Sequence, residues 1–89
     1  MKIYNYHGRC NTSGVRIKEL RTREGITQEQ LAARMQVEGV QINQKGISRI
    51  EAGERIVADF ELMIFAKVLK TSPQHLLDSS EPKDPSFFR

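Results

Sequence analysis

Apolar side chains recur at helical spacing along the chain, and no segment alternates apolar and polar residues with the period of two that a strand would require. A first helix is predicted with Ser13 as its N-cap and with Ile17 and Leu20 on its inner face. Gly25 would end this helix, because glycine readily adopts the left-handed conformation of a helix C-terminus. The pattern therefore predicts an all-α domain.

A second helix is predicted to begin after Thr27, because Thr-Gln-Glu-Gln at residues 27–30 forms a capping box. Three apolar residues would line its buried face: Leu31, Ala32 and Met35. The segment 37–42 contains Gly39 and leaves two interpretations open. It either prolongs this helix by a turn or forms a longer connection.

A third helix is predicted to start at its cap, Asn43, and to run to Ala52, with Gly53 ending it. A fourth helix is expected to begin with Asp59 as its cap and to reach about Lys70.

Ser72 and Pro73 predict a short fifth helix, with the serine as cap and the proline at the first helical position. Residues 1–12 show no clear periodicity and are interpreted as an N-terminal arm. Residues 79–89 contain two prolines and four charged residues and are interpreted as a tail. The five helices would thus occupy one domain at 13–78.

The third helix is predicted to present a polar face free of acids. At about 100° per residue, the isoleucines Ile47 and Ile50 fall on the side opposite this face. Glutamine can pair with adenine, and arginine or lysine with guanine, through two hydrogen bonds. An ordinary solvated helix face would also be polar, but it would more often mix acids with bases. The candidate base-reading residues are Gln44, Lys45, Ser48 and Arg49.

Two residues are candidates for DNA phosphate contacts. Gln28 lies in the first turn of the second helix, where free N–H groups and the helix dipole favour an anion. Thr-Gln also occurs at many helix starts for capping alone. Arg55, just past the third helix, could hold the other flank of the groove.

Glu51 falls at the edge of the buried side of the third helix, where a carboxylate needs a partner. Arg21, late in the first helix, is the candidate for a structural ion pair; the alternative is a solvated glutamate. Gly46 is unusual inside a helix and should weaken it by roughly 0.5–1 kcal/mol relative to alanine. Close approach of another backbone could explain this glycine.

The fourth helix is apolar on two sides. One side would belong to the domain core: Leu62, Phe65, Ala66 and Leu69. The other side carries Phe60, Ile64 and Val68 and needs its own cover. A homodimer could cover this stripe. Alternatively, the arm or the tail could do so, using Ile3, Tyr4, Phe87 or Phe88.

The composition suits a small soluble domain: 89 residues, 38% hydrophobic and 28% charged, with a net charge of +3. This mild basicity permits nucleic-acid binding without demonstrating it. Cys10 is the single cysteine, so no internal disulfide can form, and the cytoplasm is the expected location. A metal site at His7 and Cys10 would lack two of the usual four ligands, so no metal is expected. No signal peptide or membrane span is expected either.

Several linked segments resemble the Xre-type helix-turn-helix family, which has the five-helix fold of phage repressors and Cro. They read Ile-Lys-Glu-Leu-Arg at 17–21, Gly-Ile-Thr-Gln-Glu-Gln-Leu-Ala at 25–32 and Ile-Ser-Arg-Ile-Glu-Ala-Gly at 47–53. Further matches lie within 61–69 and 72–77. Residues 37–41 look inserted relative to the common pattern, as in a bacterial subgroup with a longer connection.

The resemblance implies that the second and third helices form the DNA-reading unit, with the third in the major groove. It implies the base and phosphate contacts named above, except that at Arg55, and supports the Arg21–Glu51 pair. We therefore expect a transcriptional regulator, more specifically a repressor that binds its operator as a dimer and needs no cofactor. The alternative is a protein-interaction module, such as an antitoxin. No acid–base pair, nucleophile triad or metal set indicates an enzyme.

Overall fold

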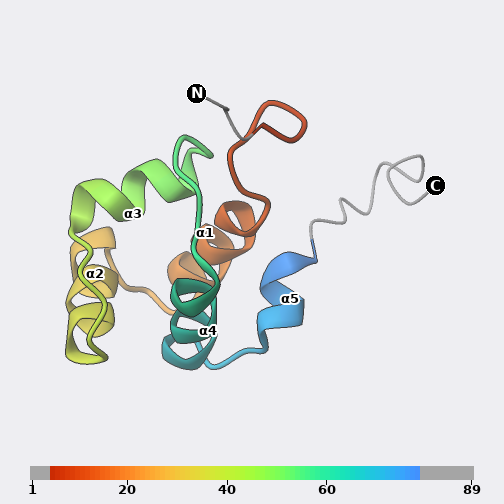
Figure 1. The fold of residues 1–89 in the computed structure, drawn as a ribbon. Helices are drawn as coiled ribbons and strands as arrows, with labels where there is room; N and C mark the ends of the chain where they lie inside the picture. The colour runs from red at the N-terminus through yellow and green to blue at the C-terminus, as the bar shows by residue number, and fades with distance from the viewer. Residues whose placement is uncertain (1–4, 79–89) are drawn as a thin grey trace.

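The computed structural model describes residues 5–78, in which five α-helices and no strand make up the regular structure (Figure 1). The helices are α1 (Ser13–Arg23), α2 (Gln28–Val37), α3 (Gln44–Glu51), α4 (Asp59–Val68) and α5 (Pro73–Leu77). The all-α prediction with five helices is confirmed. Within the same residues, no helix is both long and apolar enough to cross a membrane.

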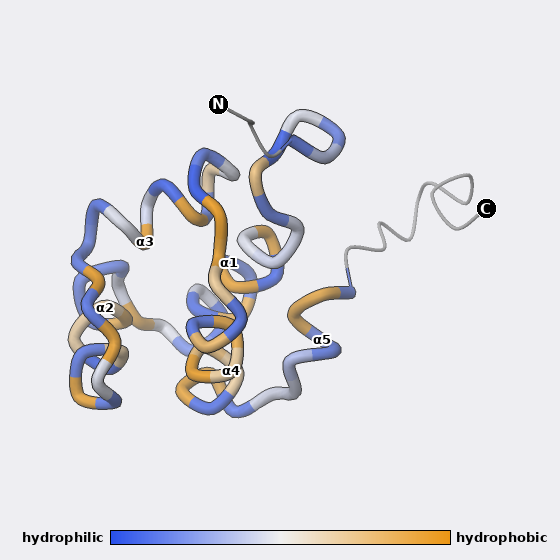
Figure 2. The backbone as a smooth tube through the Cα atoms, in the orientation of Figure 1, coloured by the Kyte–Doolittle hydropathy of each residue, from blue (hydrophilic) through white to orange (hydrophobic). Residues whose placement is uncertain are grey.

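Every helix contributes to one core. α3 packs against α1 and α2, and α5 packs against α1 and α4. The largest side chains without exposed surface are Ile17, Leu31, Met35, Ile47, Ile50, Phe65 and Leu76. Hydrophobic and hydrophilic residues alternate around the turns of α2 and α4 in Figure 2, as helices with one buried face require.

Three of the predicted helix starts are confirmed by their caps. The Gln30 N–H donates to Thr27 Oγ1 at 3.0 Å, and the Thr27 N–H donates to Gln30 Oε1 at 2.8 Å, which completes the capping box of α2. The Gly46 N–H donates to Asn43 Oδ1 at 2.9 Å at the start of α3. Ser72 caps α5 in the same way, and Pro73 is the first helical residue.

The predicted cap of α1 is wrong. Ser13 is the first helical residue and is buried, and the residue before it, Thr12, makes no capping hydrogen bond through its side chain. Instead, Asn11 Oδ1 accepts a hydrogen bond of 2.8 Å from the Gly14 N–H. Because residues 11–13 are all of capping types, the local sequence did not distinguish among them.

The predicted cap of α4 is also wrong. Asp59 is the first helical residue, and Ala58 is the N-cap. Since alanine has no capping group, Glu61 reaches back, and its Oε1 accepts a hydrogen bond of 3.0 Å from the Ala58 N–H. The helix ends at Val68, shortly before the expected Lys70, which has a positive φ of 59°.

The segment 37–42 forms a longer connection and does not prolong α2. The helix ends at Val37, and Gly39 turns the chain with a φ of +92°. Val40 and Ile42 are then buried in the core. A Cβ atom on Gly46 would lie 2.8 Å from Cγ1 of Ile42, so this glycine admits a side chain of the connection rather than another backbone.

Candidate nucleic-acid interface

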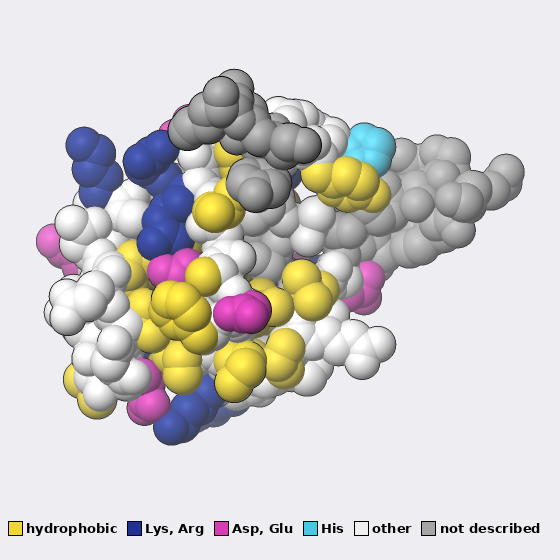
Figure 3. All heavy atoms as spheres, in the orientation of Figure 1, with side chains coloured by type: hydrophobic (Ala, Val, Ile, Leu, Met, Phe, Trp, Pro, Cys, Tyr) yellow, Lys and Arg dark blue, Asp and Glu magenta, His cyan; other side chains and the backbone are white. Residues whose placement is uncertain are grey.

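α3 presents its predicted polar face to solvent. Gln44, Lys45 and Arg49 are exposed, and Ser48 is half-buried. Lysine and arginine side chains gather at the upper left of Figure 3, over the region of α3. The opposite side of the helix is anchored in the core by Ile47 and Ile50.

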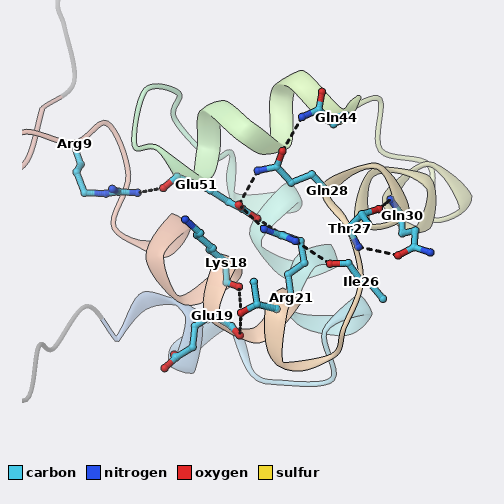
Figure 4. A network of polar contacts seen from close by, with 11 residues as sticks. Arg9, Lys18, Glu19, Arg21, Ile26, Thr27, Gln28, Gln30, Gln44 and Glu51 are labelled. Atoms are coloured by element: carbon cyan, nitrogen blue, oxygen red, sulfur yellow. Dashed lines mark hydrogen bonds and ion pairs between the residues drawn. The ribbon is translucent and has the colours of Figure 1, made fainter.

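The first residues of α2 and α3 are joined through their side chains (Figure 4). Nε2 of Gln44 donates to Oε1 of Gln28 at 2.7 Å, and Nε2 of Gln28 donates to Oε1 of Glu51 at 2.9 Å. The start of α3 is therefore linked to α2 and to a buried carboxylate.

A buried ion pair links α1 to α3. Arg21 Nε lies 2.6 Å from Glu51 Oε2, and Arg21 Nη2 lies 3.1 Å from Glu51 Oε1. Only 11% of the Arg21 side chain and 4% of the Glu51 side chain are exposed. Arg21 also donates to the Ile26 carbonyl at 2.8 Å, so it fixes the turn between α1 and α2 as well.

This network fixes the orientation of two side-chain amides. An ionised carboxylate only accepts hydrogen bonds, so Gln28 must turn its NH2 group toward Glu51 and its oxygen toward Gln44. Gln44 in turn must use one N–H for Gln28, and its second N–H and its carbonyl oxygen remain for another partner. One donor beside one acceptor is the pattern that adenine offers in the major groove.

Arg55 holds α4 to the loop after α3. Its Nη1 and Nη2 donate to the two carboxylate oxygens of Glu61 at 3.0 and 2.9 Å. Burial acts to raise the pKa of Glu61, but the hydrogen bonds from Arg55 and from the Ala58 N–H outweigh it and lower that pKa below its ordinary value of 4.5. The hydrogen bonds between Arg55 and Glu61 raise the pKa of Arg55 against the opposing effect of burial. About a quarter of the guanidinium side chain, 28%, stays exposed.

Residues 17–76 match the family model of the helix-turn-helix, of the Xre-like type. The chain belongs to this family. The chain is also similar to the restriction-modification controller protein C.AhdI from Aeromonas hydrophila, whose crystal structure is known at high resolution. The two are 29% identical, with a TM-score of 0.64, over 73% of this chain and 91% of that one. The chain matches no curated protein. Family and structural likeness together support a DNA-binding transcriptional regulator.

The match begins at Ile17, so it leaves out Arg9 and Asn11, which the structure places against α3. Arg9 and Asn11 both donate to backbone carbonyls at the C-terminal end of α3. The interpretation of residues 1–12 as a separate arm missed these contacts. No periodicity marks them, and their acceptors lie about forty positions further along the chain.

The stripe on α4 is partly exposed. Phe60 keeps 58% of its surface exposed, whereas Ile64 and Val68 are half-buried and pack against the core. The residues considered as an alternative cover, Ile3, Tyr4, Phe87 and Phe88, lie outside the described residues. Within residues 5–78, no group of three or more histidine, cysteine, aspartate or glutamate side chains could hold a metal ion.

Proposed function

We propose that this family member is a transcriptional repressor that reads a DNA operator in the major groove with α3. The observation that carries the proposal is the chain of contacts from Gln44 through Gln28 to Glu51, which holds a reading side chain in one orientation before DNA arrives. Such preorganisation matters because a side chain with many rotamers would lose conformational entropy on binding, and that loss would weaken the affinity. The protein would act in the cytoplasm by occupying its site, without catalysis.

We assign the base contacts to the exposed face of α3. Gln44 pairs with adenine, because its remaining N–H and oxygen match the N7 and N6 groups of that base. Lys45 and Arg49 contact guanine. The Ser48 hydroxyl can donate or accept a hydrogen bond, so it contacts a base without selecting one type. Each good contact with two hydrogen bonds discriminates by about 1–3 kcal/mol.

We assign the phosphate contacts to Gln28 and Arg55. The side chain of Gln28 is held between Gln44 and Glu51, so its backbone N–H at the start of α2 meets the phosphate oxygen. The exposed part of Arg55, beside α3, contacts the opposite flank of the groove. These contacts give affinity that falls with salt but carry no sequence information.

In this proposal, two copies of the chain form a dimer through three apolar side chains of α4: Phe60, Ile64 and Val68. A two-fold symmetric dimer brings the same apolar patch of both copies together and covers it from water. It also presents two reading helices to half-sites about 34–36 Å apart. The likeness to a restriction-modification controller protein supports genes of a restriction-modification system as the targets.

The proposal is tested by selecting bound duplexes from a random-sequence DNA pool at several salt concentrations. We expect one enriched sequence with two-fold related halves, and an affinity whose logarithm falls linearly with the logarithm of the salt concentration. Equal binding to all duplexes would contradict sequence reading. No binding at low salt, together with a tight protein partner, would favour the protein-interaction alternative.

Repression is tested separately with a reporter gene whose promoter overlaps the enriched sequence. Expression of the protein should lower reporter output. A variant with Gln44, Lys45 and Arg49 replaced by alanine serves as the control and should not. Increased output from the same promoter would establish an activator instead.

A further inference from the structure

We propose that the N-terminal arm sets the position of the reading helix, and that Arg9 and Asn11 are positioning residues for DNA recognition. This inference rests on the proposed function of α3. The two residues lie outside residues 17–76, which the family model matches. Their contacts are made to the protein backbone, so they act through α3 and not through a base.

Arg9 binds the C-terminal end of α3. Its Nη2 donates to the Glu51 carbonyl at 3.0 Å and to the Ile50 carbonyl at 3.4 Å (Figure 4 shows the contact with Glu51). Helices leave their last carbonyls without internal partners, and the helix dipole places partial negative charge there. The Arg9 guanidinium satisfies both needs at the Glu51 carbonyl, whereas the Ile50 carbonyl also accepts a hydrogen bond from the Gly53 N–H.

Asn11 joins three parts of the fold. Its Oδ1 accepts from the Gly14 N–H at the start of α1, at 2.8 Å. Its Nδ2 donates to the Ile50 carbonyl at 3.0 Å and to the Arg55 carbonyl at 2.6 Å. The residue is only 9% exposed, so these bonds form away from water. One side chain therefore connects the start of α1, the end of α3 and the loop that follows.

Two glycines leave room for the contacts of Arg9 and Asn11 with the end of α3. A Cβ on Gly14 would lie 2.1 Å from the Ile50 oxygen, and a Cβ on Gly53 would lie 2.7 Å from Cζ of Arg9. Both distances are too short for a real side-chain atom. Gly53 also has a φ of +79°, and its carbonyl accepts from the Cys10 N–H at 2.7 Å. The close packing of Arg9 and Asn11 against α3 thus depends on one glycine in α1 and one glycine after α3.

The position of α3 matters because base pairs are read by short, directional hydrogen bonds. Productive recognition needs groups held within about 0.5 Å of their working geometry. The Arg21–Glu51 pair and the contact with Gln28 hold α3 on its α1 and α2 side. Arg9 and Asn11 hold the backbone carbonyls at its C-terminal end. Loss of the arm contacts should let that end shift while phosphate contacts persist.

The test uses two arm variants of the full chain, Arg9→Lys and Asn11→Leu. Lysine keeps the positive charge but lacks the planar guanidinium, whose Nη2 reaches the Glu51 carbonyl while its Nε reaches the Asn11 carbonyl. Leucine has a similar shape to asparagine but cannot bond to any of the three segments. Arg23→Lys is the matched control, because Arg23 is exposed on α1 and lies about 200° around that helix from Arg21. The probes are the duplex enriched by the wild-type protein and a scrambled duplex of equal length.

If Arg9 is a positioning residue, Arg9→Lys should bind the enriched duplex about tenfold more weakly, because one hydrogen bond from a charged group is lost. Its affinity for the scrambled duplex should stay within about twofold of the wild-type value. The salt dependence should not change, because no phosphate contact is lost. Asn11→Leu should show a larger loss of the same kind. Melting curves locate a temperature at which each variant is folded; if Asn11→Leu does not fold, Arg9→Lys decides alone.

Two results would overturn the inference and leave the proposed function intact. In the first, Arg9→Lys and Arg23→Lys both bind the enriched duplex as the wild type does. In the second, both duplexes lose affinity by the same factor, which would make Arg9 a phosphate contact. If the wild type enriches no duplex, the proposed function fails, and the inference falls with it.

Discussion

The side-chain amide of Gln44 donates to that of Gln28 across 2.7 Å, so the N-terminal ends of α2 and α3 meet at one edge of the domain. Gln44 is exposed, whereas Gln28 also bonds to the buried Glu51. A surface residue proposed to read DNA is thereby connected to the interior. Residues connected in this way should not contribute to binding independently.

Gln28→Ala and Gln44→Ala should therefore combine non-additively in binding to the enriched duplex. Gln44→Ala should weaken preference for one base pair, and Gln28→Ala should free the Gln44 amide and weaken the same preference. A double-mutant cycle measured by DNA titration should give a coupling free energy of about 0.5–3 kcal/mol. Additivity within about 0.3–0.5 kcal/mol would show that the contact has no role in binding.

Arg49→Ala should relax sequence preference by about 1–3 kcal/mol at one base pair, because an arginine that we propose pairs with guanine would be lost. The measurement is competition between the enriched duplex and its single-base variants. Arg34→Ala removes the same charge from the last turn of α2 and should weaken all duplexes alike or not at all. If Arg49→Ala keeps both affinity and preference, the reading face has been placed wrongly.

Glu51→Ala should lower the free energy of unfolding by about 3–5 kcal/mol, because Arg21 would remain buried without its partner. Urea unfolding followed by circular dichroism measures this loss. Glu54→Ala, at an exposed position, should change stability by no more than about 0.5 kcal/mol. An unchanged melting temperature for Glu51→Ala would contradict the structural role of the pair.

The Arg55–Glu61 pair should make stability depend on pH. The pKa of Glu61 is lowered in the folded chain, so folding is favoured by its charged form above the ordinary value of 4.5. This contribution is lost as the pH falls through the lower pKa of the folded state, where both states bind the proton. Melting temperatures of the wild type and Glu61→Gln should therefore differ at pH 7 and converge in strong acid. A difference that stays constant down to pH 2 would rule out this linkage.

Phe60→Ser should convert the protein to a monomer, because it removes an exposed aromatic ring from the proposed dimer stripe. The folded monomer should lose little stability, since 58% of the residue is exposed in the single chain. Sedimentation at tens of micromolar distinguishes the two states. Leu77→Ser, which changes an exposed apolar residue of α5, should leave the dimer intact. A wild-type monomer at the same concentration would remove the basis for pairing through α4.

Local chemistry explains which features of the fold could be predicted. The caps at Thr27, Asn43 and Ser72 each act within four residues, so the sequence indicated them directly. The cap of α4 escaped prediction because Ala58 has no capping group and Glu61 supplies the bond instead. The burial of Glu51 followed from counting angles around the third helix, which needs no knowledge of the tertiary fold.

Features of the interface that depend on distant residues were not visible in the sequence. The contact between Gln28 and Gln44 depends on the angle between α2 and α3, which the connection at 38–43 sets through its buried residues. The arm contacts are made to backbone carbonyls, and every residue has a carbonyl, so no sequence pattern marks the acceptors of Arg9 and Asn11.

The arm contact also bears on the order in which the chain can fold. α3 has only eight residues, too few for a stable helix in isolation. Asn11 lies 39 and 44 positions from the two carbonyls that it binds at Ile50 and Arg55. During synthesis Asn11 emerges first, and it can form these hydrogen bonds only after Ile50 and Arg55 have been added to the chain. We therefore expect α3 to reach its final form late, after a long loop has closed, and a nascent chain that stops before Arg55 should not bind DNA specifically.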